Sequence, residues 1–290
     1  MSDSSSKRGQ KARLPDGRSL GYAEYGDPRG RPILFFPGAP SSRLLHPPEG
    51  ATTSLGARVI VVERPGFGLS DFQKGRKLLD WPKDVTAFAD AMGIERFAVA
   101  GNSAGGPYAA ACAFGIPERV TRAAIIAGLG PTDLAGAIEE MPRIRRAGVA
   151  VARRAPWILR ATLWLMGNPN RNPERFFRRM ASGNSAVDQE VMSRPEIQRM
   201  LMENFREATR SGVRGFAREA IILSGSWGFR LEDISIPVDV WHGEEDANVS
   251  LSAARHLADT IPDCHATFLP GKGHWLFLEH WEEILGSLLS

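Results

Sequence analysis

The chain is poor in cysteine, and its cysteines form no recognisable pattern. Only two cysteines occur in 290 residues, and Cys112 and Cys264 show neither a CxxC pair nor a metal-type spacing. A disulfide framework and a zinc site are therefore not predicted, and two thiols fit a reducing cytoplasm. We expect no metal and no organic cofactor, because the sequence has no ligand cluster and no dinucleotide-binding fingerprint.

Long apolar runs and dense basic runs are also missing. No run of about eighteen consecutive apolar residues occurs, so a membrane span is not predicted. The N-terminal sequence "MSDSSSKRGQKARLPDG" lacks the apolar segment of a secretory signal, and we expect a cytoplasmic protein. The formal net charge is only +3, and no Lys/Arg run interleaved with aromatic residues indicates a nucleic-acid partner. The sequence leaves the oligomeric state open.

Short apolar runs that alternate with amphipathic segments dominate the rest of the chain. A polar turn at residues 15–17 predicts an opening hairpin. Buried strands are predicted at 33–36, 59–62, 97–100, 123–127, 238–241 and 266–269, with helices at 81–92, 107–113 and 251–260 and a last helix ending at 289. This alternation predicts an α/β fold with a mostly parallel sheet and helices on both of its faces.

The alternation stops in the middle of the chain. From about residue 131 to 235 strand signals vanish, and Pro156, the pair Asn172-Pro173 and Pro195 each mark the start of a helix. We therefore predict three segments: the first part of an α/β core at 1–130, a helical cap at 131–235 and the second part of the core at 236–290.

The segment "GNSAGG" at 101–106 predicts a tight turn between a strand and a helix. Its glycines remove clashes at a strained apex, and the apex side chain, Ser103, would project at the carboxyl edge of the sheet. Ser103 is therefore the candidate nucleophile, with the backbone N–H of Ala104 as a candidate oxyanion donor. A glycine-rich packing turn is the alternative.

A serine nucleophile needs a base and an acid that orients the base. Of six histidines, His274 is the predicted base, because it lies in a glycine-flanked loop directly after a strand. Asp246, just beyond another strand, is the predicted acid, and Asp133 is the reserve candidate. His242 is interpreted as structural. We expect activity to fall as the pH drops through about 6 to 7, where a histidine base becomes protonated.

The order Ser103, Asp246, His274 resembles the triad order of the α/β-hydrolase superfamily. The segments "RPGFGLSD", "GNSAGG", "HGEED" and "GKGH" resemble motifs of that family in the same order, and the likeness to a cap-bearing serine hydrolase, similar to small bacterial carboxylesterases, covers nearly the whole chain. The resemblance implies a second oxyanion donor, which we map to the backbone N–H of Ala39. Pro37 stands where the family usually has histidine.

The resemblance implies acyl chemistry on a small-molecule substrate. We predict a serine hydrolase that cleaves a small or medium, hydrophobic carboxylic ester through an acyl-enzyme, with Trp157, Trp164 and Trp275 as substrate contacts. The triad is shared by proline-type aminopeptidases, lactonases, carbon–carbon bond hydrolases and perhydrolases, and these remain alternatives. A ligand sensor that keeps the fold with little turnover is a further alternative of another class.

Overall fold

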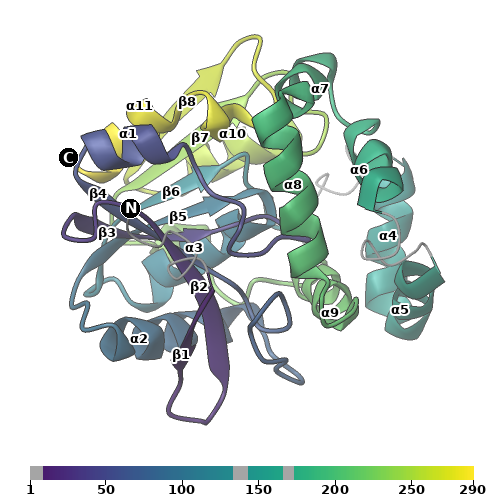
Figure 1. Cartoon of the computed structure of the whole chain (residues 1–290), viewed down its shortest axis with the longest axis horizontal. Helices are drawn as coiled ribbons and strands as arrows, with labels where there is room; N and C mark the ends of the chain where they lie inside the picture. The colour runs from purple at the N-terminus through teal and green to yellow at the C-terminus, as the bar shows by residue number, and fades with distance from the viewer. Residues whose placement is uncertain (1–8, 133–142, 166–172) are drawn as a thin grey trace.

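A single twisted sheet organises the protein (Figure 1). The computed structural model describes residues 9–132, 143–165 and 173–290, without some of the side chains between 143 and 180. The eight strands are β1 (Gln10–Arg13), β2 (Ser19–Gly26), β3 (Arg31–Phe36), β4 (Ala57–Val62), β5 (Phe97–Asn102), β6 (Val120–Ile126), β7 (Val238–Gly243) and β8 (Cys264–Leu269). Their spatial order is β1-β2-β4-β3-β5-β6-β7-β8. The pairs β1–β2 and β2–β4 are antiparallel and all others are parallel, so the predicted mostly parallel sheet is confirmed.

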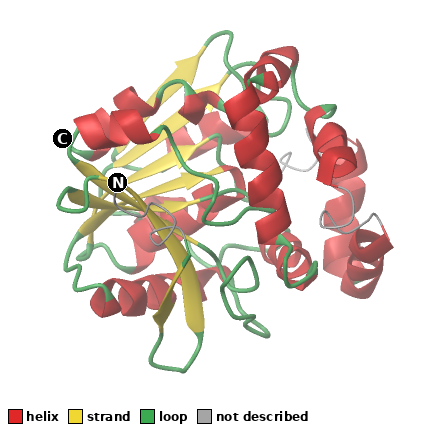
Figure 2. Cartoon of the chain, in the orientation of Figure 1, coloured by secondary structure: helices red, strands yellow, loops and turns green. Residues whose placement is uncertain are grey.

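Helices cover both faces of the sheet (Figure 2). Those of the α/β core are α1 (Glu49–Ser54), α2 (Trp81–Ala91), α3 (Gly106–Gly115), α10 (Leu251–Thr260) and α11 (Trp281–Leu288). Apolar side chains of α2, α3 and α10 share one buried cluster with the sheet, and those of α11 share the cluster on the opposite face. Strands buried on both faces carry continuous apolar runs, and for that reason the sequence revealed them.

Helices alone occupy the described residues between β6 and β7. They are α4 (Arg143–Arg154), α5 (Pro156–Leu165), α6 (Pro173–Ala181), α7 (Ala186–Ser193), α8 (Pro195–Ala208) and α9 (Arg214–Leu223), followed by the short 3-10 helix Leu231–Asp233. These helices fall in the predicted cap, which stays a prediction. We call α7–α9 the inner cap helices and α4–α6 the outer cap helices, because α8 stands between the sheet and α4–α6 in Figure 1. The predicted starts at Pro156 and Pro195 match α5 and α8, whereas Asn172 lies outside the described residues.

The remaining differences from the sequence prediction are small. The six-residue helix α1, with the sequence EGATTS, was not predicted because it carries no apolar periodicity. Strand β8 begins at Cys264, two residues before the predicted run. Within the described ranges, none of the helices is both long and apolar enough to cross a bilayer.

Candidate active site

Ser103 occupies a strained turn at the carboxyl end of β5. Its φ angle is 55°, a left-handed conformation that is uncommon for residues other than glycine. A Cβ atom on Gly101 would lie 2.2 Å from the carbonyl oxygen of Gly105, and one on Gly105 would lie 1.9 Å from that of Phe36. Both positions therefore require glycine. The short 3-10 helix Ser103–Gly105 then leads directly into α3.

Asp246 and His274 meet in loops that follow β7 and β8. The His274 ring nitrogen Nδ1 lies 2.7 Å from Asp246 Oδ2, and the side-chain exposures are 8% and 0%, respectively. The other carboxylate oxygen of Asp246 accepts the backbone N–H groups of Asn248 (2.6 Å) and Val249 (3.0 Å). With the carboxylate on Nδ1, the proton of a neutral ring is held on that nitrogen and Nε2 remains the basic atom.

The electrostatic surroundings keep this acid charged and its second histidine neighbour neutral. Burial by itself would raise the pKa of Asp246, but attraction to His274 and the hydrogen bonds outweigh burial and hold the pKa below its usual value. Burial lowers the pKa of His242 despite the nearby Asp246. The His242 ring is fully buried and its Nε2 pairs with the Val249 carbonyl at 3.2 Å.

The three predicted catalytic residues lie at the same edge of the sheet. Ser103 follows β5, Asp246 follows β7 and His274 follows β8, and these strands are mutually parallel. In the described part of the chain, no hydrogen bond joins the Ser103 hydroxyl to the His274 ring. Catalytic hydrogen bonds often tighten only when a substrate is bound.

The loop after β3 packs against Ser103, and Arg64 fixes its orientation. A Cβ atom on Gly38 would lie 3.2 Å from Ser103 Cβ. Buried Arg64 donates to the carbonyl oxygens of Pro37 (2.5 Å) and Gly38 (2.8 Å). Because a trans peptide directs its N–H opposite to its C=O, the N–H of Ala39 points away from Arg64. This N–H donates no hydrogen bond to any described residue.

A buried polar network connects Arg64 to the inner cap helix α9. Arg64 Nε donates to Glu219 Oε1 at 2.6 Å, and the other carboxylate oxygen of Glu219 accepts from Arg76 and, at 2.8 Å, from the Tyr108 hydroxyl. Burial by itself would raise the pKa of Glu219, but the charges of Arg64 and Arg76 outweigh burial and lower it. Sequence reasoning missed this network, because residues so far apart in the chain share no local pattern.

The predicted substrate contacts have different surroundings. Trp275 is buried and packs edge-on against His274, with ring centroids 6.0 Å apart. Trp157 lies on α5 with 71% of its surface exposed. The side chain of Trp164 and the reserve acid Asp133 lie outside the described residues. All three tryptophan contacts therefore stay predictions.

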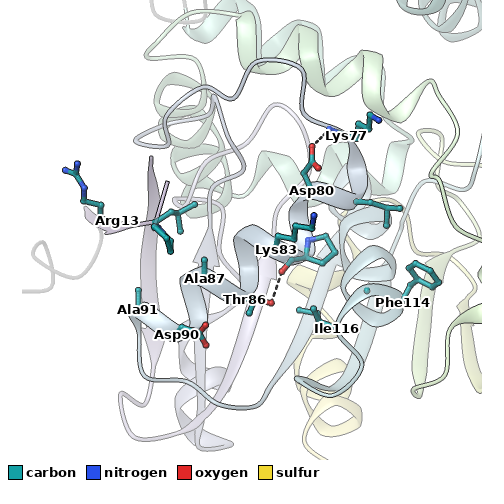
Figure 3. Close-up of a pocket in the computed structure, with 15 residues that line it drawn as sticks. Arg13, Lys77, Asp80, Lys83, Thr86, Ala87, Asp90, Ala91, Phe114 and Ile116 are labelled. Carbon is teal, nitrogen blue, oxygen red and sulfur yellow. Dashed lines mark hydrogen bonds between the residues drawn. The ribbon is translucent and has the colours of Figure 1, made fainter. Parts of the chain in front are cut away.

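A broad depression elsewhere on the surface is separate from this edge. Figure 3 shows it beside β1, α2 and α3, where Arg13, Lys83, Phe114 and Ile116 contribute to its lining. Its volume is about 1050 Å³, and none of the three predicted catalytic residues lines it. Among the described residues, no cluster of His, Cys, Asp or Glu side chains is placed to hold a metal ion.

Comparisons with known sequences and structures all relate the chain to hydrolytic enzymes. A sequence model described as the alpha/beta hydrolase family matches residues 33–286. A 2-hydroxy-6-oxononadienedioate/2-hydroxy-6-oxononatrienedioate hydrolase from Burkholderia vietnamiensis is 26% identical over 264 residues, covering 88% of this chain and 83% of the relative. An enol-lactonase structure from Burkholderia xenovorans LB400 superposes with a TM-score of 0.71 at 19% identity, covering 97% of this chain and 99% of that one. A thermophilic esterase from Thermogutta terrifontis gives 0.68 at 21% identity, covering 97% and 96%.

Proposed function

The chain belongs to the alpha/beta hydrolase family, and from that premise we propose that it is a serine hydrolase that cleaves small or medium carboxylic esters. The hydrogen bond between His274 Nδ1 and the buried carboxylate of Asp246 carries the proposal. It leaves Nε2 as a base, and the strained turn presents Ser103 at the same sheet edge. In this proposal Ser103 is the nucleophile, His274 the base and Asp246 the residue that orients it.

The reaction proceeds in two steps that regenerate the enzyme. The Ser103 oxygen bonds to the ester carbonyl carbon while its proton moves to His274, and the alcohol leaves with that proton as the carbon–oxygen bond breaks. Water then attacks the acyl-enzyme, giving its proton to His274. The carboxylic acid is released when the bond to Ser103 breaks and the proton returns to the serine oxygen.

The backbone N–H groups of Ala39 and Ala104 are the proposed donors to the oxyanion that forms in each step. Ala104 lies in the first turn after the strained residue, where N–H groups have no intrahelical partner. The N–H of Ala39 is turned away from Arg64, and it has no acceptor among the described residues. Pro37 in place of histidine is compatible with this pair of oxyanion donors, because Arg64 holds the loop through the carbonyl oxygens of Pro37 and Gly38.

A carbon–carbon bond hydrolase is the second candidate, and one observation favours it. The Burkholderia vietnamiensis relative is named for a 6-oxo dicarboxylate, a compound whose name contains a ketone and no ester. Hydrolysis of such a compound must break a carbon–carbon bond next to the ketone. The same base and oxyanion donors serve a ketone carbonyl, so the substrate and not the triad distinguishes the two reactions.

A substrate panel with matched serine variants tests both candidates. Purified protein is assayed with p-nitrophenyl esters of increasing chain length, a lactone, a proline-terminated peptide and a 2-hydroxy-6-oxo-dienoate. We expect ester turnover, and a loss of kcat of about 10³-fold or more in Ser103→Ala. Ser54→Ala, an exposed serine on α1, is the control.

Each result has a distinct meaning. Turnover of the dienoate alone would replace the esterase proposal with the carbon–carbon candidate. Saturable binding with little turnover of any substrate would instead favour a ligand sensor. Full activity of Ser103→Ala on esters would remove Ser103 from its role.

A further inference from the structure

The inner cap helix α7 contributes a carboxylate to the loop that carries His274. Asp188 is 1% exposed, and its two side-chain oxygens accept the backbone N–H groups of His274 and Trp275, both at 2.9 Å. The Ser185 hydroxyl also donates to this carboxylate, at 2.9 Å. A Cβ atom on Gly273 would lie 2.4 Å from the carboxylate. The loop and the side chain are therefore fitted closely to each other.

The orientation of Asp188 is not the one that its place in the helix favours. Ser185 is the N-cap of α7 and accepts the Asp188 N–H, so Asp188 is the third helical residue. An acidic residue there commonly reaches back to the backbone N–H of the N-cap residue. Here the carboxylate receives the two loop amides instead, and among the described residues no cation pairs with it.

A second contact joins the same end of the cap to the loop of Asp246. The side chains of Asn184 and Asn248 are hydrogen-bonded at 2.5 Å. The backbone N–H of Asn248 in turn donates to Asp246 at 2.6 Å. The segment from Asn184 to Asp188 therefore touches both loops whose side chains form the Asp246–His274 pair.

We propose that Asp188 is a positioning residue that fixes the backbone of His274, so that the placement of the catalytic base depends on the docking of cap helix α7. The inference rests on the proposed function, in which His274 is the base. Two N–H groups buried beside Asp188 need acceptors, and this cap residue supplies both of them. A shift of α7 displaces the imidazole, and small misplacements of a catalytic group cost large factors in rate.

The test measures how fast Ser103 reacts with a small fluorophosphonate. The rate of this reaction depends on the serine and its base, and it does not require that the natural substrate be known. The serine oxygen bonds to phosphorus, fluoride leaves and the serine proton passes to His274. We expect Asp188→Ala to slow labelling by about 10- to 100-fold. Asp188→Asn retains one acceptor oxygen, and we expect it to be labelled at an intermediate rate. If Asp188→Ala folds poorly, Asp188→Asn is the variant that tests the inference.

The matched control is another buried carboxylate far from the site. Asp84 on α2 is also buried and pairs with Arg18 at 2.6 Å. Asp84→Asn removes a charge in the same way, and we expect it to lower the melting temperature while labelling stays within about twofold of the wild type, because distant sites act independently. A merely structural role of Asp188 predicts the same pattern for Asp188→Asn, and that result would overturn the inference.

A double-mutant cycle tests the contact itself. Gly273→Ala introduces a methyl group against the Asp188 carboxylate, and we expect it to slow labelling with the carboxylate present. In the double variant with Asp188→Ala the methyl group has room, so we expect labelling no slower than in Asp188→Ala alone. Multiplicative effects would mean that the two residues act independently and would refute the inference.

The result for the wild type separates this inference from the function on which it rests. Wild-type labelling that Ser103→Ala abolishes, together with unchanged rates in both Asp188 variants, would overturn only the role of Asp188. No wild-type labelling would overturn both proposals.

Discussion

The inner and outer cap helices make different use of polar side chains. Each inner helix carries one buried polar side chain that is hydrogen-bonded to the core, none more than 1% exposed: Asp188 of α7 to His274, Asn204 of α8 to Ser42 and Glu219 of α9 to Arg64. Among the outer helices, Arg153 of α4 donates to the Thr132 carbonyl and hydroxyl oxygens, and Thr132 lies in the loop after β6 and outside the predicted core segments. The inner helices therefore form part of the support of the site.

Charge distinguishes the two regions in the same way. Residues 143–181 contain ten arginines and one acidic residue, whereas residues 182–223 contain six arginines and six acidic residues. At the two ends of α8, Arg194 and Arg210 have carboxylate partners, Glu279 at 2.5 Å and Glu207 at 3.0 Å. Unbalanced charge requires solvation, and the exposed Arg154, Arg178 and Arg179 have it. An arginine-rich helix therefore says little about where the site is.

Apolar packing completes the contrast. Met192, Leu201 and Phe205 of the inner helices belong to the same buried cluster as α11 and one face of the sheet. The outer helices pack chiefly on the inner ones, α4 and α5 on α9 and α6 on α8. These helices are thus layered, although Phe177 of the outer helix α6 joins the same buried cluster.

Among the substitutions that distinguish the inner from the outer helices, the largest effect on stability and labelling is expected at Glu219. Replacing it by Gln leaves the charges of Arg64 and Arg76 without a buried counterion, which typically costs about 3–5 kcal/mol of unfolding free energy. It also frees Arg64, so we expect fluorophosphonate labelling of Ser103 to slow by about tenfold or more. Denaturant unfolding and labelling rates measure the two effects.

Glu203→Gln is the control, because this exposed glutamate lies on the inner helix α8. We expect it to change neither quantity. Lower stability of Glu219→Gln with an unaltered labelling rate would show that Arg64 holds the oxyanion loop without the cap.

A smaller effect is expected from acidification, which should loosen the inner layer first. Despite burial, Arg43 holds the pKa of Glu207 below its usual value, and Arg194 and Lys272 do the same for Glu279. A carboxylate with a lowered folded-state pKa gives stability that is present above its unfolded pKa, about 4.3, and is lost as the pH falls through the folded value. Hydrogen exchange between about pH 5 and 3, corrected for its intrinsic rate, should show α8 losing protection before β5.

The contribution of Glu63 to stability has the opposite pH dependence. Burial raises its pKa despite Arg43, so its contribution favours the folded state as the pH falls. Simultaneous loss of protection in α8 and β5 would contradict the layered description.

The smallest effect is expected at Trp157 in the outer layer. Because its side chain is 71% exposed, Trp157→Ala should change the unfolding free energy by no more than about 0.5 kcal/mol and leave kcat and KM for short esters within about twofold. Trp275→Ala, which removes a buried side chain beside His274, is the comparison variant. A large increase in KM for Trp157→Ala would place the outer layer at the substrate.

The sequence alone determined the buried strands, the core helices other than α1 and the local turn at Ser103. The buried part of β3, residues 33–36, is a run of consecutive apolar residues. The turn at Ser103 requires glycines at fixed short spacings. Periodicity and steric exclusion act over a few residues, so a single sequence reveals them. Asp246 and His274 were also predicted as partners, because each lies in the loop that follows a strand.

Only the tertiary structure decided what supports these residues. Asp188 and His274 are 86 residues apart, and Arg64 and Glu219 are 155 apart. A buried carboxylate and an exposed one look the same in a sequence, and packing alone decides which donor each receives. The residues of the candidate site are thus recognisable from local sequence, whereas the contacts around them are long-range and form only in the folded chain.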